Sequence, residues 1–142
     1  MTKRSIEPKP TARRPAGKKP SRATVATARK VAGYAYDKKA GDVLIMDLRK
    51  VTDLTRFFIL CSGESGPQVK AIADNVLEQA RKAGIEIYNV EGYDALRWIL
   101  IDMIDIVVHI FQPEVRRYYQ LERLWGDAPV ERIGDGEAES GS

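Results

Sequence analysis

The sequence predicts one α/β domain in which helices flank a mixed, five-stranded sheet. Two patterns predict this class. A strand, a helix and a second strand follow one another between residues 57 and 90, which is typical of a βαβ unit. Two apolar segments separated by only two residues occupy residues 98–111, which is typical of an antiparallel hairpin. At 142 residues the chain suits one ordinary domain.

The first helix and two strands are predicted after Arg22. Gly41 ends a helical pattern, and two buried strands follow at Val43–Leu48 and Phe57–Cys61, because aromatic and β-branched residues suit a sheet. The helical pattern itself consists of Val25, Ala28, Ala32, Ala35 and Tyr36.

The clearest helix is predicted between Ser65 and Gly84. Ser65 and Gln68 have the spacing of a capping box, and Pro67 in the first turn loses no hydrogen bond. The strand Ile85–Val90 follows and should run parallel to the preceding strand through a right-handed crossover. The apolar face of this helix consists of Val69, Ile72, Ala73, Val76, Leu77 and Ala80.

The hairpin joins Trp98–Asp102 to Asp105–Phe111, with Met103-Ile104 as the predicted turn. In that register the facing pairs are Trp98–His109, Ile99–Val108 and Ile101–Ile106. Alternation makes one side of the hairpin wholly aliphatic, and that side should face the core. The other side carries Trp98, Leu100, Asp102, Asp105, Val107, His109 and Phe111.

The mixed side of the hairpin has three interpretations. Aromatic residues beside polar groups resemble the hot spots of binding surfaces. Asp102, Asp105 and His109 are the candidates for a metal or acid–base site. Alternatively, Trp98 and His109 pack beneath another helix and only fill space. Periodicity in the sequence does not choose among the three.

Several features weaken an enzymatic interpretation. The single histidine excludes a two-histidine metal site within one chain. Cys61 lies in an apolar strand, where a buried thiol is usually inert. The loop Ser62–Pro67 lacks the glycine pattern of a nucleotide-binding loop, and Glu64 would repel an anion. We therefore expect no catalytic residue, no bound metal and no cofactor.

Charge is distributed unevenly and divides the chain. Residues 1–22 hold eight Lys or Arg against one acid, a net charge of +7, and since the whole chain carries +3, the remainder carries −4. With four prolines and few large apolar side chains, residues 1–23 are expected to be a disordered basic tail. Residues 24–126, ending in a helix over Pro113–Leu124, are the expected domain. Residues 127–142 are the expected acidic, flexible C-terminal tail.

The basic tail and the cysteine count suggest partners and a compartment. The tail could bind rRNA, because each Lys or Arg near a phosphate releases counterions, or it could be a solubilising segment without a fixed partner. Cys61 is the only cysteine, no signal peptide is expected before the domain, and no apolar run is long enough to span a bilayer. A cytoplasmic protein that does not enter a membrane is expected.

Six motifs occur in a fixed order between residues 24 and 126. They are DKKAGD (37–42), FFILCSGES with QVKAIAD (57–74), Glu91-Gly92, WILID (98–102), DIVVHIF (105–111) and RRYYQLERLW (116–125). In this order they resemble the ribosomal silencing factor family, also called the Iojap family. The resemblance covers nearly the whole folded part.

The resemblance implies a small α/β protein with a nucleotidyltransferase-like layout and no known transferase activity. Members bind the large ribosomal subunit through ribosomal large-subunit protein fourteen and sterically block its association with the small subunit. Translation is thereby repressed when nutrients run short. The resemblance also implies self-association when the protein is free.

The resemblance assigns partner-binding residues by position. Pro67, Ile104 and Arg56 depart from residues usual in the family, and the basic tail is an addition. Trp98 matches the docking tryptophan. The remaining candidates are Asp102, Asp105 and His109 in the hairpin motif and Tyr119, Leu121, Glu122 and Trp125 in the C-terminal helix motif.

Two alternative functions come from other classes. A nucleotide-handling enzyme on the same layout would bind nucleotides, although the chain lacks the paired acids of a D-x-D motif. A general RNA-binding domain is disfavoured by the acidic folded part and by the absence of aromatic-basic RNA motifs.

Overall fold

The computed structural model describes residues 22–119 and 126–134. Predictions on the remaining residues lie outside the described part of the chain, including those for most of the basic tail and for Leu121, Glu122 and Trp125. The elements in order are α1 (Val25–Tyr36), β1 (Gly41–Asp47), β2 (Phe57–Ser62), α2 (Gly66–Lys82), β3 (Asn89–Glu91), β4 (Trp98–Asp102), β5 (Ile106–Phe111), α3 (Pro113–Tyr119) and β6 (Val130–Ile133).

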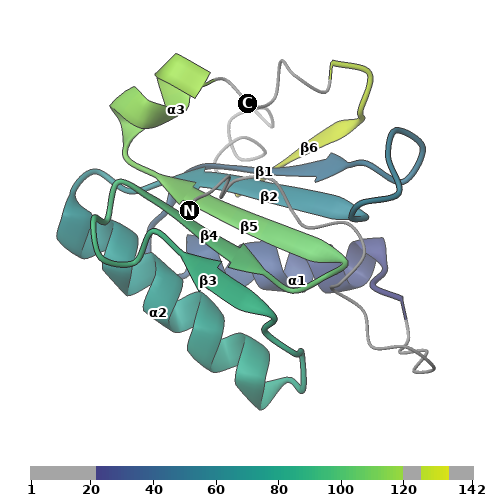
Figure 1. The fold of residues 1–142 in the computed structure, drawn as a ribbon, viewed down its shortest axis with the longest axis horizontal. Coiled ribbons are helices and arrows are strands. Elements are labelled where there is room, and N and C mark those ends of the chain that lie inside the picture. The colour runs from purple at the N-terminus through teal and green to yellow at the C-terminus, as the bar shows by residue number, and fades with distance from the viewer. Residues whose placement is uncertain (1–21, 120–125, 135–142) are drawn as a thin grey trace.

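The sheet is mixed, as predicted, but it has six strands in the order β3-β4-β5-β2-β1-β6 (Figure 1). Only β2 and β5 pair in parallel, and every other pair is antiparallel. The unpredicted strand is β6, which pairs with β1 inside the segment 127–142 that we had expected to be flexible. The tail prediction is therefore wrong for Val130–Ile133. The segment VERI is short and mostly exposed, so its own sequence gave no strand signal.

The predicted βαβ unit is correct only in that its two strands run in the same direction. Strand β3 runs parallel to β2, yet β4 and β5 lie between them, and the parallel neighbour of β2 is β5. The expected strand Ile85–Val90 is also shorter, because only Asn89–Glu91 pairs, with β4. The connection through α2 therefore passes over β5 and β4, and it does not join two neighbouring strands.

Each face of the sheet carries its own core cluster. Figure 1 shows α1 and α2 together on one side, where they cover the larger cluster, which includes Ile59, Ile99 and Ile110. The opposite face carries a smaller cluster, which includes Leu60, Phe111 and Val115 of α3. All six residues of β2 are buried because the strand contributes to both clusters. This explains its uninterrupted apolar sequence.

The helices begin where the sequence predicts. Ser65 caps α2 by accepting a hydrogen bond from the backbone N–H of Gln68 at 3.2 Å, with Pro67 in the first turn. Thr24 caps α1 through a reciprocal bond with Thr27. None of the helices in the described ranges has the length and apolar content that crossing a bilayer requires.

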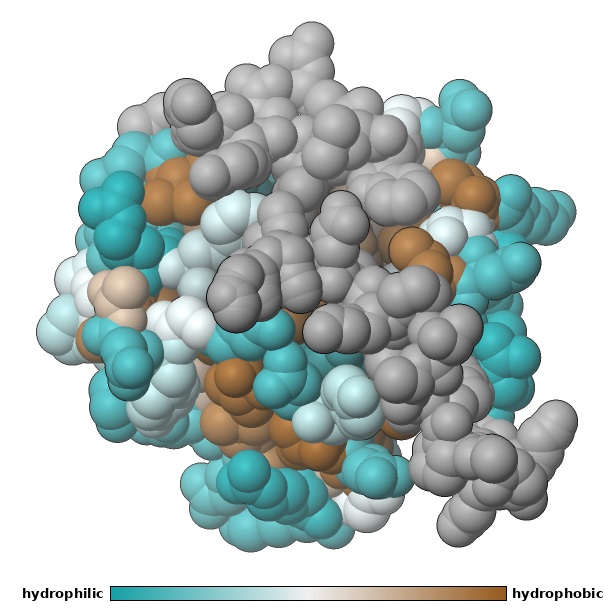
Figure 2. All heavy atoms as spheres, viewed as in Figure 1, coloured by the Kyte–Doolittle hydropathy of each residue, from teal (hydrophilic) through white to brown (hydrophobic). Residues whose placement is uncertain are grey.

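Apolar side chains reach the surface near β3 and α2. Figure 2, drawn from the same side as Figure 1, shows them surrounded by hydrophilic residues. The core there is thinly covered, because β3 is a short edge strand that follows an irregular segment. The partly buried residues of this region include Leu77, Ile85, Ile87 and Val90.

The predicted register of the hairpin is wrong by two residues. The turn is centred on Ile104-Asp105, and the Met103 N–H donates to the carbonyl of Ile106 at 2.8 Å. The reason is Ile104, which adopts a φ of +70°, a conformation that an isoleucine seldom takes. The facing pairs are Trp98–Phe111, Ile99–Ile110, Leu100–His109, Ile101–Val108 and Asp102–Val107. A shift of two preserves the two faces, so the predicted sorting is correct for the side chains within β4 and β5. It is wrong for Asp105, which lies in the turn and reaches the start of α1.

Candidate docking surface

Trp98 begins β4 on the sheet face that α1 and α2 do not cover, and it is half-buried beside the smaller core cluster. Its backbone is fixed by the preceding loop. The side chain of Gln112 donates to the carbonyl of Leu96 at 3.0 Å, and its backbone N–H donates to the carbonyl of Arg97 at 2.9 Å. The indole is therefore held at a defined place on the sheet.

Aromatic rings surround the indole. The ring centroid of Trp98 lies 5.0 Å from that of Phe111 and 6.0 Å from that of His109. His109 stacks on Phe111 at 5.9 Å and meets Phe58 edge-on at 4.5 Å. Because the four residues come from β2, β4 and β5, the cluster exists only in the folded sheet. The three rings beneath Trp98 are buried, which leaves the indole as the outermost member.

The polar atoms of this cluster are directed inward. Trp98 Nε1 donates to His109 Nδ1 at 3.2 Å, which places the proton of the neutral imidazole on Nε2. Burial lowers the pKa of His109 to about 3, so the ring stays neutral at physiological pH. Its Nε2 has no hydrogen-bond partner in the part of the chain described. His109 thus supports Trp98 and is unsuited to acid–base chemistry.

Stability should fall with acid because of His109. The unfolded imidazole binds a proton near its ordinary pKa of 6.5 and the folded one only near 3, so stability present above pH 6.5 is lost as the pH falls below it. We expect the free energy of unfolding to drop by about 2 kcal/mol between pH 7 and pH 5. Chemical denaturation of the wild type and of His109→Gln measures this, since glutamine keeps an acceptor but does not titrate. Equal slopes in both proteins would contradict it.

Asp102 and Asp105 are both buried and serve the backbone. Asp102 Oδ1 accepts the N–H of Ile104 at 2.8 Å and so holds the turn. Asp105 Oδ2 accepts the N–H of Ala23 at 2.9 Å, and the same oxygen lies 3.6 Å from Arg22 Nε. Asp105 lies in the turn, and neither carboxylate forms a site with His109. No group of three metal-binding side chains occurs in the described ranges.

Removing the carboxylate of Asp105 should loosen the start of α1. In Asp105→Ala the N–H of Ala23 loses its acceptor, and we expect a loss of about 1–3 kcal/mol in unfolding free energy. Asp105→Asn keeps an acceptor oxygen and should lose less. Guanidinium denaturation of the three proteins gives the order, and an alanine variant as stable as the wild type would exclude this anchoring role.

The other groups considered for chemistry are also structural. Burial raises the pKa of the Cys61 thiol to about 12, so it is not a nucleophile at neutral pH. In the loop before α2, Gln68 Oε1 accepts the N–H of Glu64 at 2.7 Å and Ser65 Oγ accepts that of Gln68. Two donors that could cradle a phosphate are thereby occupied.

The C-terminal helix is joined to the sheet by a residue that the sequence analysis missed. Arg116 is buried, and its Nη1 donates to the carbonyl of Asp42 at 3.0 Å and to Ser62 Oγ at 2.9 Å. Its place in an RRYY sequence gave no sign of burial. Tyr119 ends α3, but its side chain lies outside the described part, as do Leu121, Glu122 and Trp125.

Fold and site together define a small α/β protein whose described polar side chains support the fold. A solved structure from Chromobacterium violaceum superposes with a TM-score of 0.70 at 37% identity, covering 73% of this chain and 88% of that one. A second, from Bacillus halodurans, has a TM-score of 0.69 at 37% identity and covers 78% and 100%.

A family model described as ribosomal silencing factor during starvation matches residues 20–141. The Bacillus subtilis ribosomal silencing factor is 43% identical over 108 residues, which are 75% of this chain and 92% of the relative. The chain belongs to the ribosomal silencing factor family. A more distant relative, from the mouse, is named for the mitochondrial assembly of the ribosomal large subunit and is 29% identical over 91 residues, 62% of this chain and 40% of the relative.

Proposed function

We propose that this chain represses translation by binding the large ribosomal subunit at ribosomal large-subunit protein fourteen, where it blocks the small subunit. The observation that carries the proposal is the position of Trp98, half-buried on the sheet face opposite to α1 and α2. The names of its relatives support a ribosomal role, and the name of the mouse relative supports the large subunit in particular.

The geometry of Trp98 suits docking. Its N–H is already bonded to His109, so a partner meets the apolar ring and need not satisfy a further donor. The rings of His109 and Phe111 hold the indole in place, which lowers the ordering entropy lost on binding. His109 supports the indole directly, whereas Asp102 and Asp105 act from the turn at the other end of the hairpin by holding its backbone. We propose that Tyr119, Leu121, Glu122 and Trp125 contact the same partner, because they match the family's C-terminal motif.

A steric mechanism needs no chemistry from the protein. Occupying the face of the large subunit that meets the small one is sufficient to prevent joining. We further propose that the protein acts in the cytoplasm, self-associates when free, and reaches rRNA with its basic tail.

Subunit joining tests the proposal directly. Purified large and small subunits are mixed with and without an excess of the protein and separated on a sucrose gradient. We expect the joined peak to fall and the protein to migrate with the large subunit. Undiminished joining at saturating protein would refute the mechanism.

The alternative function, a nucleotide-handling enzyme, predicts a different result. Calorimetric titration with ATP, CTP and Mg²⁺ should give micromolar binding if that function is correct. We expect no binding heat, since the described residues bring together no group of metal-binding side chains.

A further inference from the structure

A polar hollow of about 510 Å³ lies beside the start of β2, away from Trp98. Three guanidinium groups reach it from separate parts of the chain. Arg22 lies before α1, Arg49 lies in the loop after β1, and Arg56 is the residue before β2. The lining residues are Arg22, Arg49, Thr52, Asp53, Thr55 and Arg56. Such a gathering of arginines around one hollow is the arrangement that binds phosphate groups.

Two of the arginines are held in place by the fold. Arg49 donates to both carboxylate oxygens of Asp47, at 2.9 and 2.6 Å, and its guanidinium lies 5.1 Å from the centre of the Phe57 ring. Arg56 Nε donates to the carbonyl of Ala23 at 2.9 Å. Because their conformations are already restricted, little side-chain entropy remains to be lost on binding an anion.

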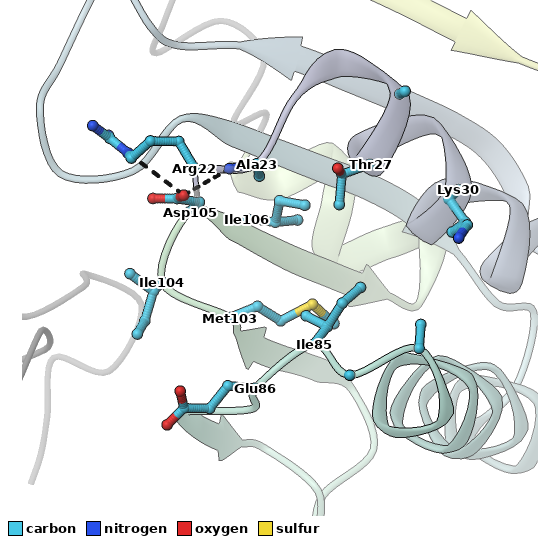
Figure 3. A pocket seen from close by; sticks show the side chains of 13 residues that line it. Arg22, Ala23, Thr27, Lys30, Ile85, Glu86, Met103, Ile104, Asp105 and Ile106 are labelled. Atoms are coloured by element: carbon cyan, nitrogen blue, oxygen red, sulfur yellow. Dashed lines mark hydrogen bonds and ion pairs between the residues drawn. The ribbon is translucent and has the colours of Figure 1, made fainter. Parts of the chain in front are cut away.

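The third arginine, Arg22, is held by a longer contact. Asp105 binds the N–H of Ala23 at 2.9 Å, and its contact with Arg22 is longer, at 3.6 Å. Figure 3 shows the Arg22 side chain reaching away from α1, on the side of Asp105 opposite to Lys30. With 55% of its side chain exposed, Arg22 remains available to a ligand.

These arginines retain unused hydrogen-bond donors. Arg49 Nη1 and both terminal nitrogens of Arg56 have no acceptor in the described ranges, and Thr52 Oγ1 accepts a bond from Leu54 without donating its own proton to a described residue. Asp47 and Asp105 partly neutralise Arg49 and Arg22, and Asp53 is the one carboxylate in the lining. Arg56 has no carboxylate within ion-pair distance in the described part. The three arginines and the carboxylates of Asp47, Asp53 and Asp105 balance in formal charge, so what the hollow offers to a phosphate is its unused donors rather than a net positive charge.

The position of the hollow along the chain identifies the ligand class. Arg22 is the last of the eight basic residues in 1–22, so the basic tail is covalently continuous with the lining. The rest of the chain carries a net charge of −4, so it has no overall attraction for anions. A linear polyanion can contact the hollow and the tail together, whereas a single free phosphate cannot.

We propose that this hollow, which we call the arginine hollow, binds the phosphate backbone of single-stranded RNA. The proposal rests on the proposed function, in which that RNA belongs to the large subunit. The acidic remainder of the domain then limits RNA contact to one end of the sheet, and so orients the protein on the ribosome.

The test uses the full chain and a fluorescent single-stranded RNA of about 16 nucleotides. The first double variant, Arg49→Gln with Arg56→Gln, removes two guanidinium groups from the hollow. The control, Lys38→Gln with Lys39→Gln, removes the same positive charge from the exposed turn after α1. Binding is measured from about 50 to 300 mM salt. We expect the double arginine variant to have a slope of log affinity against log salt concentration that is smaller by about 1.4, which corresponds to two lost phosphate contacts. Its affinity for the RNA at a salt concentration near 0.1 M should fall by about tenfold. The lysine pair should change both far less.

Equal effects of the two double variants would overturn the proposal, since only net charge would then matter. Micromolar binding of ATP to the wild type that is lost in the arginine pair would also overturn it, by assigning the hollow to a free nucleotide. Thermal unfolding checks that the variants fold, and Arg49→Gln alone, with half the slope change, serves if the double variant does not.

Failure here is distinguishable from failure of the proposed function. If the wild type does not bind large subunits, the naked-RNA measurement still tests the arginine hollow. If subunits bind and joining is blocked with an unchanged salt slope in the arginine pair, only the arginine hollow is misassigned.

Discussion

Trp98→Ala should reduce the affinity for large ribosomal subunits by roughly 30- to 1,000-fold, because truncating a central aromatic anchor costs about 2–4 kcal/mol. The indole is the outermost ring of its cluster, and its removal takes away the apolar surface offered to the partner. Co-sedimentation with large subunits over a range of protein concentrations measures the change.

Two further variants serve as controls for that result. Trp98→Phe keeps an aromatic ring but not the N–H that His109 accepts, so it should retain most of the binding if the ring face is what the partner contacts. Tyr88→Ala removes an exposed aromatic residue just before β3, 41% accessible, and should leave binding unchanged. A folded Trp98→Ala protein that sediments like the wild type would show that the anchor is elsewhere.

Gly92→Ala should destabilise the protein by about 2–5 kcal/mol. Gly92 has a φ of +82°, where a side chain costs about 1–2 kcal/mol. A Cβ there would also lie 2.0 Å from the carbonyl oxygen of Trp98, which overpacks the backbone by about another 1–3 kcal/mol. Chemical denaturation measures the loss. The variant should also bind large subunits more weakly, because the clash displaces the strand residue that carries the indole.

Gly84→Ala is the matched control. Gly84 has nearly the same φ, +81°, but nothing lies within 4 Å of the added Cβ, so only the backbone term of about 1–2 kcal/mol remains. If the two alanine variants are equally stable, the close approach of Gly92 to Trp98 is of no consequence.

The sequence predicted the faces of the hairpin better than its register. Alternation between inside and outside survives a shift of two residues, so Trp98 and Ile99 were sorted correctly although their partners were not. The register depends on the turn, and there Ile104 takes a positive φ that its residue type does not suggest. Backbone strain of this kind is held by tertiary contacts, including the bond from Thr55 Oγ1 to the carbonyl of Ile104.

Alternation placed most of the candidate hairpin residues on one face of the sheet, but it did not reveal their contacts. Asp102 occupies the backbone-holding role that paired acids near turns commonly take. The burial of His109 depends on Phe58, which is distant in sequence, so no local pattern could reveal its lowered pKa. Arg56 departs from the residue usual at its position in the family, and here it binds the carbonyl of Ala23 at the entry to α1. Contacts between distant segments decided the roles of His109 and Arg56.

The pairing of β1 with β6 has a consequence for biosynthesis. Until Val130–Ile133 leave the ribosome, the growing polypeptide has β2 as the only possible neighbour of β1, and one row of backbone N–H and C=O groups stays open to other chains. The sheet is therefore completed only after β6, the last of its strands in the described part of the chain, has been synthesised.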